Sequence, residues 1–166
     1  GHFHNDNSVA VLRDIPGVIL AVPSNGADAA RMLRECVRLA REEQRVVVFL
    51  EPIAQYPMRD LHGDKDGQWM SRYPDPSERI ALGEVGVSGE GADLAIVTFG
   101  NGVYLSNQAL PEIEKAGIKA RIVDTRWAMI STMASAVTGA SARRRRASGA
   151  RSSAENESSN RKIEGL

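Results

Sequence analysis

The sequence predicts an α/β protein with parallel strands, and three observations support this. Two uninterrupted apolar runs, Val18 to Val22 and Val46 to Leu50, predict strands, and the first is typical of a strand that is covered on both faces. The segment between them places apolar residues at helical spacing, which predicts a helix. A second strand, helix and strand pattern follows after residue 92. This order of elements favours a parallel sheet with helical crossovers.

The first unit begins with a short helix after Ser8, because a serine hydroxyl can satisfy a free backbone N–H, and Pro16 and Gly17 end it. The first strand then runs from Val18 to Pro23. The turn at residues 24–26 leads into the long helix, whose opposite face is rich in arginine. The apolar stripe of this helix consists of Ala29, Met32, Leu33, Cys36, Val37 and Ala40.

Residues 52–76 have no regular apolar pattern and are rich in Gly, Asp and Pro. A connection of this length is an interdomain linker or a functional loop. Trp69 and Tyr73 lie within it. They are candidates for contact with a partner subunit, or for covering a neighbouring surface of the chain itself.

The second unit is predicted as a strand at residues 93–99, a turn at 100–102, a helix at 103–116 and a strand at 120–123. Pro111 lies inside the predicted helix. Proline removes a helical hydrogen bond and clashes with the preceding turn, at about 3 kcal/mol. We therefore expect a kink there, or two shorter helices.

From Ser131 to Asn160 the sequence has almost no large apolar side chain, so this tail is predicted to be disordered. It includes four consecutive arginines, Arg143 to Arg146, which would attract phosphate. They lack interleaved aromatic residues, and the whole chain carries 21 basic and 21 acidic residues. We therefore predict no nucleic-acid partner.

The chain has no apolar run as long as the roughly 18 residues of a membrane span, so no membrane association is expected. Its single cysteine, Cys36, cannot form an internal disulfide, and its place in the apolar stripe indicates packing rather than nucleophilic chemistry. These features predict a soluble, cytoplasmic protein. The chain starts at Gly1 without a methionine or a leader pattern, so we expect a fragment of a longer protein.

Three short segments, in this order, resemble landmarks of one enzyme family. The first has a histidine followed by IPG and a strand that ends in proline, the second has FLEP followed by a tyrosine, and the third has LG, a VTFG strand and a DTR triplet. Together they resemble the beta part of the decarboxylating component of thiamine-diphosphate-dependent 2-oxo acid dehydrogenases, within the transketolase-like family. The segments are residues 4–6 with 12–17, residues 48–52 with Tyr56, and residues 82–84, 93–100 and 123–126.

The dehydrogenase branch is favoured because transketolases and deoxyxylulose-phosphate synthases carry THQ where this chain has Phe3, His4 and Asn5, and they lack FLEP. The start of the chain looks most like bacterial proteins in which the alpha and beta parts are fused. Ile53 replaces the family's basic residue after FLEP, and the PL that follows DLR is missing. From about Ala128 no correspondence is found, which suggests a frameshift near that point.

The resemblance implies a partial α/β arrangement. It comprises the C-terminal half of a pyrimidine-binding domain at 1–58, a connecting segment at 59–78, the first half of a transketolase C-terminal-type domain at 79–130, and a disordered or aberrant tail at 131–166.

The resemblance also implies an activity. The complete enzyme would oxidatively decarboxylate a 2-oxo acid with thiamine diphosphate and Mg²⁺ and pass the acyl group to a lipoyl-bearing acyltransferase. Its partners would be an alpha part or the missing domains, in an oligomer. By resemblance, the catalytic residue in this chain is His4, because an imidazole donates and accepts protons near neutral pH. The family's cofactor-activating glutamate lies upstream of the histidine, so this chain alone is expected to be inactive and not to bind the cofactor.

Other interpretations of the same residues remain open. His4 could be an exposed terminal histidine, and with His2 and Asp6 it could mimic a metal site, although a third fixed ligand is missing. Glu51 is better explained as closing the last strand of its domain than as a catalytic glutamate. The turn at 100–102 could present backbone N–H groups to an anion or be only a tight connection.

For the whole chain, two further functions stay as alternatives. One is a transferase of the transketolase or deoxyxylulose-phosphate synthase type. The other is a non-catalytic interaction fragment that acts through Arg143 to Arg146.

Overall fold

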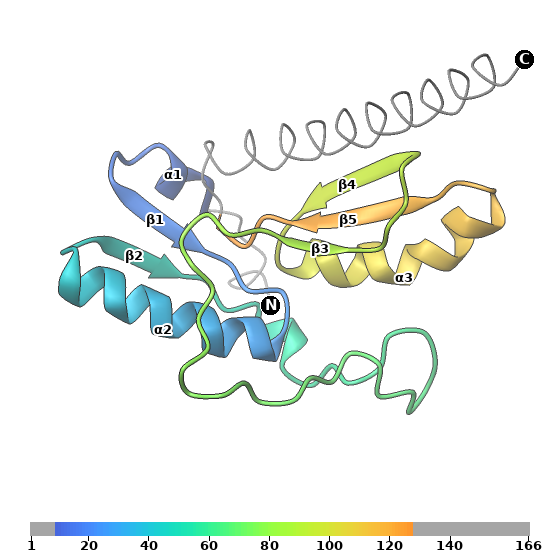
Figure 1. Cartoon of the computed structure of the whole chain (residues 1–166), viewed down its shortest axis with the longest axis horizontal. Coiled ribbons are helices and arrows are strands. Elements are labelled where there is room, and N and C mark those ends of the chain that lie inside the picture. Colours follow the sequence, from blue (N-terminus) through green and yellow to red (C-terminus); the bar gives the residue numbers. More distant parts are fainter. Residues whose placement is uncertain (1–8, 128–166) are drawn as a thin grey trace, which may run out of the picture. The chain divides into compact units, whose positions relative to one another are not determined.

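The computed structural model describes residues 9–127. Its first part contains helix α1 (Val9–Arg13), strand β1 (Val18–Ala21), helix α2 (Gly26–Glu42) and strand β2 (Val46–Phe49) (Figure 1). Strands β1 and β2 pair in parallel, from Val18 opposite Val46 to Ala21 opposite Phe49, and α2 packs on β2. The predicted strand, helix and parallel strand are confirmed.

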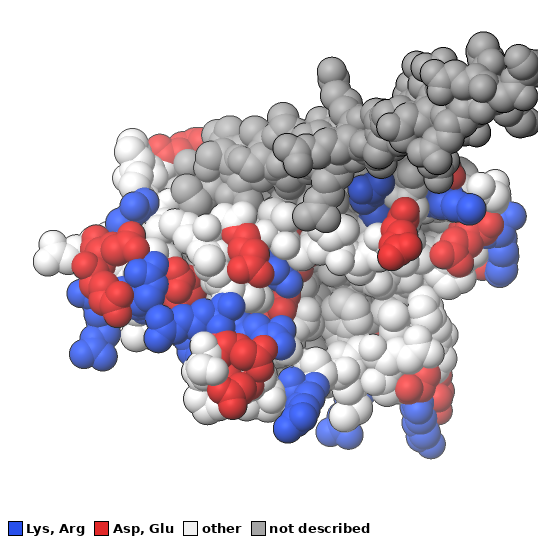
Figure 2. All heavy atoms as spheres, viewed as in Figure 1, with Lys and Arg blue, Asp and Glu red and all other residues white. Residues whose placement is uncertain are grey.

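Helix α2 begins at Gly26 because Asn25 caps it: the Asn25 side-chain oxygen accepts a hydrogen bond of 2.9 Å from the backbone N–H of Asp28. Met32, Cys36 and Leu39 are buried on its inner face, at the spacing of a helical stripe. Lys, Arg, Asp and Glu side chains adjoin one another over the region of α2 in Figure 2. Alternating charges leave no patch of a single sign on the face shown.

The second part contains strand β3 (Gly86–Ser88), strand β4 (Leu94–Thr98), helix α3 (Asn101–Lys115) and strand β5 (Ala120–Asp124). The strand order is β3-β5-β4, with β4 and β5 parallel and β3 antiparallel to β5. The predicted strand, helix and strand are present, but the sheet is mixed. The sequence did not predict β3, because a three-residue strand that starts with glycine has too little apolar alternation to be recognised.

Helix α3 is one helix from Asn101 to Lys115, with Pro111 inside it. The predicted division into two shorter helices is therefore wrong. Pro111 lies close to the C-terminal end of the helix, where few hydrogen bonds can be lost. Helical bonding resumes directly after it, since the N–H of Ala116 donates to the carbonyl of Glu112 at 3.2 Å.

The hydrophobic core of the first part takes in residues from distant sequence. Ile80 comes from the connection between the two parts and Trp127 follows β5, yet both are buried in the core. The other buried members of this cluster are Ile19, Ala21, Met32, Cys36 and Leu39. The described parts are therefore joined through one core rather than through a loose linker.

The two strands of the first part differ in how deeply their residues are buried. Three of the four β1 residues are buried, as predicted for a strand covered on both faces. Strand β2 has no fully buried residue, and Val46 is exposed.

The connection is ordered by local hydrogen bonds. It starts with a short 3-10 helix, η2 (Ile53–Gln55). Further on, the carboxylate of Asp66 accepts hydrogen bonds from four backbone N–H groups, those of Leu61, His62, Gly63 and Gln68. These bonds, led by the one from Gln68, hold the pKa of Asp66 well below its usual range. The segment is fixed on α3 by the Tyr104 hydroxyl, which donates to the carbonyl of Asp60 at 3.0 Å.

The predicted tail at 131–166 and the first eight residues lie outside the described residues. Within residues 9–127, none of the helices is both long and apolar enough to cross a membrane.

Candidate functional site

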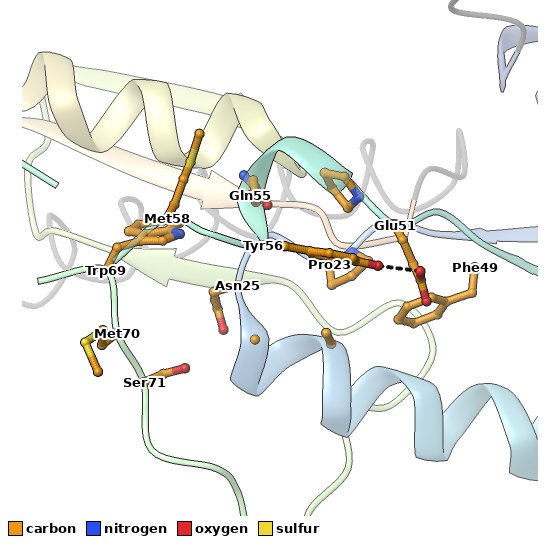
Figure 3. A pocket seen from close by; sticks show the side chains of 13 residues that line it. Pro23, Asn25, Phe49, Glu51, Gln55, Tyr56, Met58, Trp69, Met70 and Ser71 are labelled. Carbon is orange, nitrogen blue, oxygen red and sulfur yellow. Dashed lines mark hydrogen bonds between the residues drawn. The ribbon is translucent and has the colours of Figure 1, made fainter. Parts of the chain in front are cut away.

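A recess with a cavity volume of about 400 Å³ lies beyond the carboxyl ends of β1 and β2 (Figure 3). Ligands of open α/β sheets bind at this edge, because the loops that follow parallel strands converge there. We call it the Glu51 recess. The described residues that line it are Pro23, Asn25, Gly26, Ala29, Phe49, Glu51, Pro52, Gln55, Tyr56, Met58, Trp69, Met70 and Ser71.

Glu51 and Tyr56 form the polar rim of the recess. The Tyr56 hydroxyl donates a hydrogen bond of 2.5 Å to Oε2 of Glu51 (Figure 3). This bond raises the pKa of the Tyr56 phenol, since it favours the protonated hydroxyl beside a carboxylate. Glu51 is the single charged residue among the described lining residues. The described lining of the recess therefore carries one negative charge and neither lysine nor arginine.

Gln55 supplies a hydrogen-bond donor that is not used within the described structure. Its side-chain Nε2 is buried and has no partner among the residues described. A buried amide N–H without an acceptor is unfavourable by about 1–3 kcal/mol.

The far wall of the recess is built from the connection. Trp69 is held in place by an edge-to-face contact with Tyr104, with ring centroids 5.0 Å apart and an interplanar angle of 78°. Its backbone N–H also donates to the carbonyl of Arg59 at 2.9 Å. The connection thus supplies both a binding wall and the packing that fixes it.

A second polar cluster links the ends of β1 and β5. The Ser24 hydroxyl donates to Oδ2 of the buried Asp124 at 2.5 Å, and Arg126 Nε donates to Asp28 Oδ2 at 2.9 Å. Burial raises the pKa of Asp124, and the bond from Ser24 opposes that rise. These groups line a cavity of about 240 Å³. All four are mutually satisfied, so we interpret the cluster as structural.

The predicted catalytic residue His4 lies outside the described residues, as do His2 and Asp6 of the hypothetical metal site. Arg143 to Arg146 also lie outside them. Within residues 9–127, the His, Cys, Asp and Glu side chains form no group of three that could hold a metal ion.

Other predicted residues are described. Glu51 follows β2 and lies on the recess rim, and Ile53, in the place of the family's basic residue, is exposed. At the glycine turn, the N–H groups of Gly102 and Val103 donate to the carbonyls of Phe99 and Gly100, which favours a tight connection over an anion site. An added Cβ at Gly102 would lie 2.0 Å from Thr98 Oγ1, so close packing requires the glycine.

Sequence reasoning did not identify Gln55, Asn25 or Ser71 as recess residues. The FLEP and tyrosine pattern marks Glu51 and Tyr56 as family landmarks, and Glu51 is predicted to be structural. Polar residues in a loop carry no periodic signal that separates recess residues from solvent-exposed ones. The sequence predicts that Trp69 contacts a partner subunit or covers a neighbouring surface of the chain. In the structure it packs on Tyr104 and lines the recess.

Comparisons with known proteins agree with the family resemblance described above. A family model for the transketolase C-terminal domain matches residues 83–147. The match continues past Ala128, where the sequence itself indicated no further correspondence. The chain is 32% identical over 123 residues to the pyruvate dehydrogenase E1 component subunit beta of Bacillus subtilis (strain 168), which covers 74% of this chain and 34% of that protein.

The 2-oxoisovalerate dehydrogenase subunit beta of the same organism is 29% identical over 124 residues, covering 75% of this chain and 34% of its own length. The chain therefore spans about a third of these curated relatives. A solved split-gene transketolase, described as an inactive beta4 tetramer, matches with a TM-score of 0.47 and 25% identity over 70% of this chain and 33% of its own. The family resemblance found in the sequence is confirmed by the curated relatives and by the family model.

Proposed function

We propose that this chain, a partial relative of the beta subunits of thiamine-diphosphate-dependent 2-oxo acid dehydrogenases, provides the beta-type part of such an enzyme's decarboxylating component. The observation that supports this most directly is its similarity to two dehydrogenase beta subunits over about three quarters of the chain. The α/β fold with a transketolase C-terminal-type second part agrees with it.

The proposed reaction is the oxidative decarboxylation of a 2-oxo acid, followed by acyl transfer to a lipoyl group. Thiamine diphosphate, when bound, supplies the electron sink that the loss of carbon dioxide requires. The described residues do not fit this cofactor: the Glu51 recess carries a carboxylate and no cation for a diphosphate, and the described residues contain no metal-binding group. We propose that the cofactor and Mg²⁺ are held by other parts of the enzyme and that this chain alone is inactive.

His4 is the residue of this chain that we assign to the chemistry. The assignment rests on the family resemblance of residues 4–6 and 12–17, and on the ability of an imidazole to exchange protons near neutral pH. Its proposed role is contact with the substrate or with the reaction intermediate.

The proposed partners follow from the same family. They are an alpha-type chain or the remaining domains of the same enzyme, and a lipoyl-bearing acyltransferase. We further propose that the assembly is oligomeric and that it acts in the cytoplasm.

The decisive experiment combines the chain with an alpha subunit of a bacterial 2-oxo acid dehydrogenase, with the beta-subunit segment upstream of the histidine that carries the cofactor-activating glutamate, and with thiamine diphosphate and Mg²⁺. Carbon dioxide release is measured with pyruvate and with 2-oxoisovalerate, the two substrates for which the relatives are named. We expect release only from the combination. His4→Ala should abolish it, whereas the matched control His62→Ala should not.

Two results would contradict the proposal. Release by the chain alone, lost in His4→Ala, would show that the chain is complete in itself. Transfer between sugar phosphates, with no decarboxylation of either 2-oxo acid, would assign the chain to the transketolase-type alternative.

A further inference from the structure

Strand β2 has an unpaired edge within residues 9–127. The sheet of the first part consists there of two strands, β1 and β2, so β2 is paired on one side only. Two strands alone are marginally stable in water, and parallel strands usually lie inside larger sheets. The unpaired edge is therefore a surface to which a further strand can add.

The composition of β2 does not protect this edge. Its sequence, Val-Val-Val-Phe, contains neither a charge nor a proline, which are the usual features that keep an exposed edge from pairing. Val46 is 63% exposed, and the other three residues are only partly buried. A strand of this composition buries apolar surface when it pairs.

The direction of the backbone groups determines which residues of β2 would bond a neighbouring strand. The N–H of Leu50 donates to the carbonyl of Ala21 at 2.8 Å, so it points toward β1. The backbone groups of successive residues in a strand point to opposite edges, so those of Val47 and Phe49 point to the unpaired edge. A partner strand has to place its own outward groups opposite these two residues.

Opposite charges flank the strand. Arg45 directly precedes β2, and Glu51 lies two residues beyond its end. The side chain of Arg45 and Oε1 of Glu51 have no partner among the described residues. The edge therefore favours a strand that brings an acidic group to Arg45 and a basic group to Glu51. A second copy of β2, running in the opposite direction, has this order of charges.

One antiparallel register of two β2 strands matches the backbone groups and the charges together. It is centred on Val48, which lies opposite Val48 of the second copy. Val47 then lies opposite Phe49, and both have outward backbone groups. Arg45 lies opposite Glu51 on the same face of the sheet. The two-fold symmetry of the pair repeats each of these contacts.

Other registers match less well. A shift of one residue places outward backbone groups opposite inward ones and exchanges the faces of the sheet. A shift of two residues in one direction places Glu43 opposite Glu51, and like charges in direct opposition are destabilising. A shift of two residues in the other direction places Glu51 opposite Val47 and leaves its charge without a partner.

We propose that two copies of this chain pair in antiparallel fashion through β2. The joined sheet runs from β1 of one copy through both β2 strands to β1 of the other, with an ion pair between Arg45 and Glu51 at each end of the joint. This inference does not rest on the proposed function. A catalytically inactive chain can form the dimer, and a monomeric chain can act with an alpha subunit, so the two failures are distinguishable.

The first measurement is sedimentation velocity of the full chain over a range of concentrations. The mass of the chain is 18.0 kDa, and we expect a concentration-dependent change from this value to twice this value. Hydrogen exchange followed by NMR locates the contact. The amides of Val47 and Phe49 should gain protection as the dimer forms, whereas that of Leu50, bonded to Ala21, should be protected at every concentration.

Charge reversal tests the register. Arg45→Glu and Glu51→Arg should each weaken the dimer about tenfold, because each variant places like charges at both ends of the joint. An equimolar mixture of the two variants should recover the affinity, since each pair across the joint is then opposite in charge. This recovery also shows that both variants are folded. Lys119→Glu changes an exposed lysine outside β2 and should leave the dimer unchanged.

Three results would overturn the proposal. They are a chain that stays monomeric at every concentration, a dimer in which Val47 and Phe49 gain no protection, and a mixture of the two charge variants that associates no better than each variant alone. The first result would leave the β2 edge to a segment of the complete enzyme.

Discussion

The Ser24 hydroxyl donates a hydrogen bond to the carboxylate of Asp124, a residue one hundred positions further along the chain. Next to it, the N–H of Val22 donates to the carbonyl of Arg126 at 2.7 Å, and Ala21 forms an isolated bridge with Trp127. The end of β1 is therefore bonded to the segment that follows β5. These contacts make the position of the recess depend on both parts of the chain.

Replacing Ser24 with alanine should lower the free energy of unfolding by about 1–3 kcal/mol, because a buried carboxylate loses its hydroxyl donor. The loss should be larger near neutral pH than in mild acid. Burial raises the pKa of Asp124, so in the folded chain its carboxyl takes up a proton above its usual range, and the protonated form tolerates burial better. Urea unfolding at both pH values measures this. Ser88→Ala, an exposed serine of the same cavity, is the control, and an equal loss in both variants would contradict the interpretation.

Glu35 should stabilise the folded chain more at neutral pH than in acid, because its pKa is lowered, whereas the pKa of Asp124 is raised. Glu35 is 5% exposed, and its hydrogen bonds with Arg38, the shorter at 2.7 Å, lower its pKa from the usual 4.5. A group with a lowered folded pKa stabilises the protein above its unfolded pKa, and this contribution is lost as the pH falls through the folded value. Glu35→Gln should reduce stability at neutral pH by about 1–2 kcal/mol and flatten the acid limb of the stability curve. An acid limb as steep as that of the unmodified chain would be inconsistent with this role.

Trp127→Ala should be strongly destabilising, by about 3–5 kcal/mol, because it removes a fully buried ring from the core. Trp127→Phe should lower the free energy of unfolding by less than Trp127→Ala does. It keeps an aromatic ring in the core, and it removes an indole N–H that has no partner within the described residues. Urea unfolding gives the energies, and hydrogen exchange of the β1 amides shows whether the first part loosens. If β1 kept its protection in Trp127→Ala, the two parts would not share a core.

Cys36 should be unreactive in the folded chain. Burial, with a contribution from Glu35, raises the pKa of its thiol to about 11, so at neutral pH only about one thiol in ten thousand is ionised. A thiol reagent such as Ellman's should therefore react slowly with the native chain and rapidly after denaturation. Fast reaction of the native chain would show that the α2 face is not packed as described.

Much of the fold was predictable from local pattern. The apolar runs at β1, β2 and β4 and the helical stripe of α2 identified their elements within one residue or so, because burial against a neighbour requires a fixed periodicity. The short strand β3 and the continuity of α3 through Pro111 were not predicted. In both, pairing or packing with other segments outweighs the local preference.

By itself, the sequence determined the α/β class and the family resemblance, because motifs and periodicity are local properties of a chain. The tertiary structure decided what those residues are next to. The bond between Ser24 and Asp124, the burial of Trp127 in the first core and the unpartnered Gln55 amide in the Glu51 recess join segments far apart in sequence. No spacing rule encodes such contacts, since they depend on how two sheets and a connection fold onto one another.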